Sequence, residues 1–200
     1  DLLGGEQSGH IAAVGFDLYS QLLADAVEVR RASREGREPA RRRTAALIDL
    51  PVSAHLADTY VADEGQRLDL YRRLGIADSD AAISAIAEEL RDRFGAPPAE
   101  AERLLEVARL RAGASEAGLT SLLIEEGRLI VRLGELQPGL AARALVANPI
   151  PALSMSGSQI RSRERVSGAE AWRLAARLVQ GIVAEVRRWE ATNAAGAPLA

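Results

Sequence analysis

A glycine-rich loop opens the chain and is the first place where chemistry is conceivable. Residues 4–9 read Gly-Gly-Glu-Gln-Ser-Gly, and the backbone amides of such a loop before a helix can hold an anion. The phosphate-loop motif is incomplete, because it requires a preceding strand and a Lys-Ser/Thr pair. Ser8 also lacks the glycine spacing of a nucleophile elbow, and His10 reads more simply as a loop residue. The loop alone therefore predicts neither a nucleotide site nor a serine hydrolase.

Histidine, cysteine and lysine usage limits the remaining chemistry. The chain has two histidines and no cysteine, which excludes disulfides and thiolate ligands and fits a reducing compartment. His55 has Asp58 one helical turn away but no further ligand cluster, so we expect no metal site. All 25 basic residues are arginine, which removes the Walker A lysine and Schiff-base chemistry. No catalytic residue emerges from these residue types.

Three acids close together, Glu88, Glu89 and Asp92, are the remaining candidates for acid–base work. On helical spacing Asp92 lies opposite the apolar stripe, whereas Glu89 can pair with Arg93 one turn later. An exposed carboxylate without a cleft around it is a poor catalyst. Two interpretations stay open for these acids, a solvated charged face or a polar protein interface.

Arginines are concentrated between residues 30 and 43, where they fill seven of fourteen positions. Such a run is either a solvated tether or a contact to DNA phosphates, with Arg41, Arg42 and Arg43 as the candidate contacts. The net charge of -3 and a pI near 5.6 argue against a protein whose whole surface binds nucleic acid. A stand-alone DNA-binding module that uses this run and the glycine-rich loop is the alternative hypothesis.

Apolar periodicity predicts the elements that position these residues. In chain order we expect a helix over 15–31, a strand over 45–50, helices over 64–74, 79–94 and 98–112, a hairpin of 122–124 with 129–133, a short helix over 139–147, edge strands within 152–163, and a helix from Ser167 to about Trp189. The first helix presents one apolar stripe, formed by Phe16, Tyr19, Leu23, Ala26 and Val27. The helix over 64–74 is expected to present Leu68, Tyr71 and Leu74 to the core. Gly95 and the following proline pair predict a fixed corner between two helices.

The expected helices and strands together indicate an α+β fold, mostly helical with a small mixed or antiparallel sheet. Two hundred residues with 48% hydrophobic content can bury a core. No apolar run approaches the roughly 20 residues of a membrane helix and no signal peptide is evident, so we expect a cytoplasmic chain without a membrane partner. The first residue is not methionine, which indicates a piece of a longer protein. We predict a linker over 32–43, a folded domain over 44–193 and a tail over 194–200.

Two stretches resemble the C-terminal end of the bacterial transcription-repair coupling factors. The run from Leu2 to Ile11, continued by Val14 to Tyr19, is similar to the end of that family's motor. The second unit is similar to the family's C-terminal domain in five pieces: Ile48-Asp49-Leu50-Pro51, His55-Leu56 with Tyr60-Val61, the run 67–74, the run 89–98 and the run 104–111. The resemblance is specific in order and spacing up to about Leu133.

The resemblance implies that residues 1–31 end a helicase motor. The loop residues Gly4, Gln7, Ser8 and Gly9 would belong to the motif, shared with the branch-migration helicase RecG, that couples ATP hydrolysis to movement on double-stranded DNA. The parent would bind ATP and magnesium upstream of this chain, displace stalled RNA polymerase and recruit UvrA. The fragment itself is expected to hold no cofactor and to catalyse nothing.

For the C-terminal domain, the resemblance implies an autoinhibitory contact. In that family the domain covers the UvrA-binding surface of an N-terminal domain until the motor engages polymerase. Glu89 and Asp92 match acidic positions of that contact, with Arg93 beside them, whereas Arg91 departs from a more apolar residue. A polar contact of this kind can be released without exposing a core.

Overall fold

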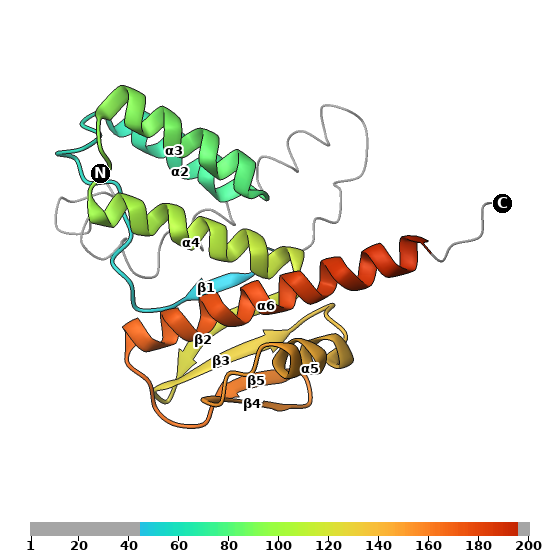
Figure 1. Ribbon diagram of the computed structural model, residues 1–200. Coiled ribbons are helices and arrows are strands. Elements are labelled where there is room, and N and C mark those ends of the chain that lie inside the picture. Colours follow the sequence, from blue (N-terminus) through green and yellow to red (C-terminus); the bar gives the residue numbers. More distant parts are fainter. Residues whose placement is uncertain (1–44, 196–200) are drawn as a thin grey trace, which may run out of the picture.

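The computed structural model describes residues 45–195, so the expectations for the loop, helix and arginine run within residues 1–44 lie outside the described residues. The described elements are β1 (Leu47–Asp49), α2 (Glu64–Ile76), α3 (Asp80–Phe94), α4 (Ala99–Glu116), β2 (Leu119–Glu125), β3 (Arg128–Leu133), α5 (Pro138–Ala147), β4 (Leu153–Ser156), β5 (Gln159–Ser162) and α6 (Gly168–Ala195) (Figure 1). The predicted α+β class, mostly helical with a small sheet, is confirmed.

The five strands form one mixed sheet in the order β1-β2-β3-β5-β4. β1 is parallel to β2, and the other neighbours are antiparallel. One row of apolar residues crosses the sheet, because Ile48 pairs with Leu122, Leu122 with Val131, and Val131 with Ile160. All four residues are buried in the core, so this row marks the inner face of the sheet.

The predicted hairpin is confirmed as β2 and β3. Its two-residue turn uses Glu126 at φ 52° and Gly127 at φ 78°. Positive φ at both central residues is the signature of the turn whose twist matches antiparallel strands, and glycine at the second position relieves the steric cost. Glu125 and Arg128 close the turn as the last pair of the ladder.

Helices α4 and α6 cover the inner face of the sheet (Figure 1). They approach closely at Gly113, where a β-carbon would lie 3.1 Å from Cγ1 of Val179. Helices α2 and α3 stack on the outer side of α4, and α5 packs against α6. The molecule therefore has the sheet at one side, a middle helical layer and an outer helix pair.

The helix termini follow the local signals in the sequence. The side chain of Ser79 accepts a hydrogen bond from the Ala82 amide, so α3 begins one residue after the serine. Gly95, at φ 83°, ends α3, and its carbonyl accepts a hydrogen bond from the Tyr60 hydroxyl at 3.0 Å. The expected corner between α3 and α4 is present. At the start of α6, the Ser167 hydroxyl accepts a hydrogen bond from the Glu170 amide at 3.3 Å.

Several details of the expected helices were wrong. Helix α4 continues to Glu116 rather than ending at residue 112, and α2 continues to Ile76. Leu68 is 44% exposed, and α2 instead buries Leu70 and Leu74. Leu68 lies about 200° around the helix from Leu70, so the two cannot face the same core. Helix α6 also continues to Ala195 rather than ending near Trp189, because no glycine or proline lies between Trp189 and Gly196.

Candidate interaction face on helix α3

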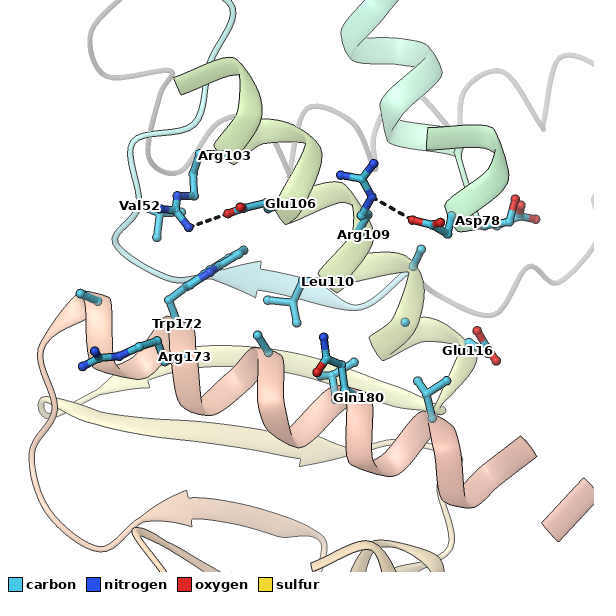
Figure 2. A pocket seen from close by; sticks show the side chains of 18 of the residues that line it. Val52, Asp78, Arg103, Glu106, Arg109, Leu110, Glu116, Trp172, Arg173 and Gln180 are labelled. Atoms are coloured by element: carbon cyan, nitrogen blue, oxygen red, sulfur yellow. Dashed lines mark hydrogen bonds and ion pairs between the residues drawn. The ribbon is translucent and has the colours of Figure 1, made fainter. Parts of the chain in front are cut away.

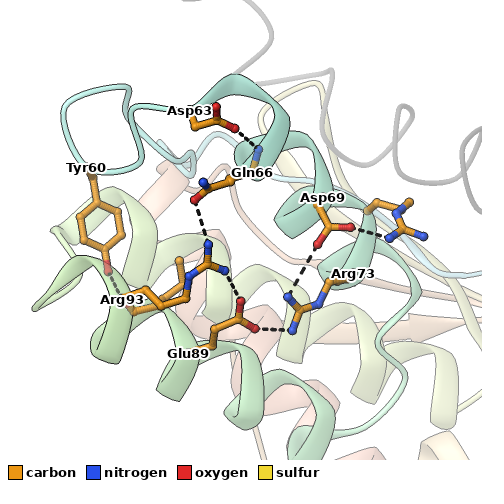
Figure 3. Close-up of polar contacts among 9 residues, drawn as sticks. Tyr60, Asp63, Gln66, Asp69, Arg73, Glu89 and Arg93 are labelled. Carbon is orange, nitrogen blue, oxygen red and sulfur yellow. Dashed lines mark hydrogen bonds and ion pairs between the residues drawn. The ribbon is translucent and has the colours of Figure 1, made fainter.

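Helix α3 divides into an apolar and a polar face. Ile83, Ile86 and Leu90 are buried and fix the helix against its neighbours. The acids that the sequence singled out lie on the other sides, with Glu88 and Asp92 exposed and Glu89 partly buried. Burial of one stripe therefore fixes the orientation of the polar face (Figure 3).

Glu89 lies between two arginines, one from each helix of the outer pair (Figure 3). Its Oε2 is 2.5 Å from a guanidinium nitrogen of Arg73 in α2, and its Oε1 is 2.5 Å from one of Arg93 in α3. Arg93 also donates to Oε1 of Gln66 at 2.9 Å, while Arg73 lies 3.7 Å from the carboxylate of Asp69. We call these five residues the Glu89 network.

The charges around Glu89 favour its ionised form. Hydrogen bonds from Arg73 and then from Arg93 hold the pKa of the Glu89 carboxyl below its ordinary value. The same bond to Glu89 is the main cause of a raised pKa for Arg73. Both carboxylate oxygens are already engaged, so Glu89 fixes the positions of the two guanidinium groups rather than offering a free charge.

Asp92 differs from Glu89 in having a free carboxylate. It is exposed, and it takes part in none of the ion pairs formed within residues 45–195. Arg93 lies next to it with a side chain that is 46% exposed, and its guanidinium stacks 5.0 Å from the centre of the Phe94 ring. The buried face of α3 fixes the positions of Asp92 and Arg93. An acid without an ion-pair partner among residues 45–195 and a partly exposed arginine can together bind a partner that carries both charges.

The structure also places the other candidate residues. The buried Nδ1 of His55 has no hydrogen-bond partner among the described residues, and the His55 backbone amide donates to the Glu100 carbonyl at 3.3 Å. Within residues 45–195, no group of three or more acids and histidines is arranged to hold a metal ion. Gly4, Gln7, Ser8, Gly9 and Arg41 to Arg43 lie outside the described residues.

Sequence reasoning missed the part of α2 in this face. Arg73 and Gln66 were not singled out, although both contact the α3 residues that were. The signal was weak because the two helices are joined by the three residues 77–79, and nothing in the sequence specifies which of the helix faces meet. The uneven charge of α2, with Asp69 beside Arg72 and Arg73, was the only pointer.

The described part of the chain is therefore an α+β domain whose charged side chains form ion-pair networks on its surface. None of its helices is both long and apolar enough to cross a membrane within residues 45–195.

Residues 50–141 match the sequence model described as the TRCF domain. The chain belongs to this family, as the C-terminal part of a transcription-repair coupling factor.

Curated relatives and a solved structure agree with this assignment. The chain is 40% identical over 188 residues to the transcription-repair-coupling factor of Mycobacterium bovis (strain ATCC BAA-935 / AF2122/97), which covers 83% of this chain and 15% of that protein. It is 36% identical over 130 residues to the one of Staphylococcus aureus (strain USA300), covering 65% of this chain and 11% of that protein. The chain thus spans a small fraction of its relatives' length.

The solved structure is the crystal structure of a C-terminal domain of a transcription-repair coupling factor. The superposition has a TM-score of 0.60 at 17% sequence identity and covers 70% of this chain and 93% of that one. At this identity the likeness concerns the fold alone.

Proposed function

We propose that this chain is the C-terminal regulatory part of an ATP-dependent DNA translocase that couples transcription to nucleotide excision repair. Its C-terminal domain would make a reversible, autoinhibitory contact with an N-terminal domain of the same protein and so cover the surface that binds UvrA. The observation that carries this proposal is the polar face of α3, where Asp92 is exposed and has no ion-pair partner among residues 45–195, beside the Glu89 network.

The structure of that face supports a contact that can be released. Glu89 and both of its arginine partners belong to the domain's own surface, so Asp92 and Arg93 are presented without a large exposed apolar area between them. A contact between charged groups at a wet rim contributes more to specificity and association rate than to affinity. Separating such a contact leaves the domain core intact.

The test is a titration of the 200-residue chain with the N-terminal UvrA-binding domain, comparing Asp92→Arg with the original chain. We expect charge reversal at Asp92 to weaken binding at least tenfold, with a smaller effect at high salt. Glu190→Arg is the matched control, because Glu190 is also an exposed helical acid but lies on α6. Equal binding of the original chain and the Asp92→Arg variant would contradict the proposal.

Glu89→Arg is a poorer test of the contact. Reversing that charge places a third guanidinium between Arg73 and Arg93, so lost binding could come from a damaged surface. Asp92 has no such partner in the described part of the chain, which is why the experiment rests on it.

For the parent protein we propose an upstream motor that uses ATP and magnesium, moves on double-stranded DNA, displaces stalled RNA polymerase and recruits UvrA in the cytoplasm. In this chain Gly4, Gln7, Ser8 and Gly9 would form the coupling loop, and Arg41, Arg42 and Arg43 would contact phosphates. The support is the resemblance of the first 19 residues to the end of the family's motor.

Gln7→Ala in the complete parent protein tests the coupling role. We expect DNA-stimulated ATP hydrolysis to remain while displacement of a triplex-forming strand falls at least tenfold. Unchanged displacement would remove Gln7 from that role.

A further inference from the structure

A large groove lies between α4 and α6 (Figure 2). Its volume is about 1110 Å³, more than a small ligand needs. Apolar side chains from the loop after β1 and from both helices line it: Val52, Leu110, Trp172, Ala176, Val179 and Val183. At one end α4 and α6 meet at Gly113 and Val179, and toward the other end the guanidinium of Arg103 lies 5.4 Å from the centre of the Trp172 ring.

The charges on the rim of the groove largely satisfy one another. Arg103 pairs with Glu106 at 2.5 Å, Arg109 with Asp80 at 2.8 Å, and Arg187 with Glu116 at 2.5 Å. Because each pair joins a positive side chain to a negative one, the rim of the groove produces no strong electrostatic field of a single sign. Such a rim suits an apolar or amphipathic segment and does not favour a polyanion such as DNA.

The chain enters the described domain beside this groove. The Ala46 amide donates a hydrogen bond to the Ser115 hydroxyl at 3.0 Å, next to Gly113 and Glu116, which line the groove. Residues 1–44 are therefore tethered at its edge. Residues 32–44 alone can span roughly 40 Å when extended, enough to reach any point along α4.

We infer that the groove is the docking site for the amphipathic helix that the sequence predicts over residues 15–31. Seventeen helical residues span about 25 Å, close to the about 27 Å of the 18-residue α4. The stripe of Phe16, Tyr19, Leu23, Ala26 and Val27 supplies the apolar anchors at i, i+3 and i+4 spacing that a helix in a groove requires.

The covalent connection to the domain favours the predicted helix over residues 15–31 as the occupant of the groove, compared with a separate molecule that binds from solution. A segment on a short linker has an effective concentration on the order of millimolar at a site that the linker can reach. Docking would place the last helix of the segment that resembles the motor directly on the C-terminal domain. This inference concerns contacts within the 200 residues and does not rest on the proposed autoinhibitory contact.

Cross-linking tests the docking, and the chain suits it because it has no native cysteine. We expect Leu23→Cys with Ala176→Cys to form an intramolecular cross-link with a short bismaleimide at least tenfold faster than Gln21→Cys with Ala176→Cys. Gln21 lies on the opposite side of the predicted helix from Leu23, so it is the matched control. Equal rates for the two pairs would overturn the inference. Cross-links between chains in place of intramolecular ones would also overturn it, because the occupant would then be a second copy.

Fluorescence gives a second test that does not depend on cysteine variants. In Trp189→Phe, Trp172 is the only tryptophan, and it lies in the groove. We expect adding Leu23→Asp to raise the acrylamide quenching constant of Trp172 at least twofold, whereas Gln21→Asp leaves it unchanged. Circular dichroism confirms that each variant is folded. Quenching that does not respond to Leu23→Asp would contradict docking over Trp172.

Discussion

A guanidinium nitrogen of Arg143, in α5, lies 2.7 Å from the carboxylate of Glu185, in α6, and the Glu185 side chain is only 4% exposed. Arg188 binds the other carboxylate oxygen at 2.8 Å. A buried carboxylate is tolerated only when it is paired and hydrogen-bonded, so the two arginines make this charge acceptable between the helices. The pair therefore fixes α5 against α6.

Replacing Arg143 should destabilise the domain more than replacing an arginine whose partner is exposed. We expect Arg143→Ala to lower the free energy of unfolding by about 1–3 kcal/mol, because Glu185 keeps only one partner while remaining buried. Arg187→Ala is the control. Arg187 is similarly exposed, but its partner Glu116 is 36% exposed, and an ion pair between exposed side chains contributes little to stability. Urea denaturation measures both, and equal losses would contradict the assigned role of burial.

Two glycines with positive φ should respond differently to alanine. At Gly118, with φ 73°, a β-carbon would lie 2.9 Å from the backbone nitrogen of Leu136, whereas at Gly157, with φ 57°, nothing lies within 4 Å. Gly157→Ala should cost about 1–2 kcal/mol from backbone strain alone. Gly118→Ala should cost clearly more, because the clash is with backbone that cannot move aside easily. Thermal unfolding of the two variants tests the order, and a smaller loss at Gly118 would show that the turn relaxes.

The Glu89 network should give the domain a component of stability that depends on pH. The pKa of Glu89 is lowered in the folded state, so its contribution is fully present above the ordinary value of 4.5. That contribution is lost as the pH falls below 4.5 toward the folded-state pKa. Between about pH 5 and pH 3 the melting temperature of Glu89→Gln should therefore fall less steeply than that of the original chain. Glu102→Gln, which changes an exposed acid on α4, should leave the slope unchanged.

Removing the hydroxyl group of Tyr71 should destabilise the domain more than removing that of Tyr60. The Tyr71 hydroxyl accepts a 2.7 Å hydrogen bond from the Leu56 amide in a partly buried position, and burial raises the pKa of Tyr71. Tyr71→Phe should cost about 1–3 kcal/mol, because an amide loses its acceptor away from water. The Tyr60 hydroxyl instead donates, to the exposed Gly95 carbonyl at 3.0 Å and to the partly buried Leu90 carbonyl at 3.2 Å. Its loss therefore leaves no backbone amide without an acceptor. Tyr60→Phe should cost less than about 1 kcal/mol by the same urea measurement.

The elements that the sequence predicted well depend on local chemistry. Ser79 and Ser167 cap helices where a serine precedes an apolar-periodic run, and Gly127 lies in a tight turn between two apolar strands. Gly95 ends α3 because its φ of 83° suits glycine. In each case the decisive contacts join residues within a few positions of one another, so a single sequence is enough to predict them.

Features that join distant segments could not be predicted in the same way. The parallel pairing of β1 with β2, the bond between Arg73 and Glu89, and the burial of Glu185 all depend on how separate elements pack. Periodicity in α2 indicated an amphipathic helix but not which of Leu68 and Leu70 faces the core. For the candidate site, helical spacing predicted the pair of Glu89 with Arg93, which is confirmed. The second partner of Glu89, Arg73 on α2, could not be predicted because it lies on a separate element.

The short strand β1 has a consequence for how the domain is made. Leu47 pairs with Ser121, more than seventy residues later, and the three helices α2, α3 and α4 lie between them. During synthesis β1 therefore leaves the ribosome long before its only described neighbour in the sheet exists, and the helices are complete first. Closing so long a loop is entropically costly and slows folding. The parallel edge of the sheet should be the last part of the domain to form, and a nascent chain that stops before Leu119 would leave β1 without its partner.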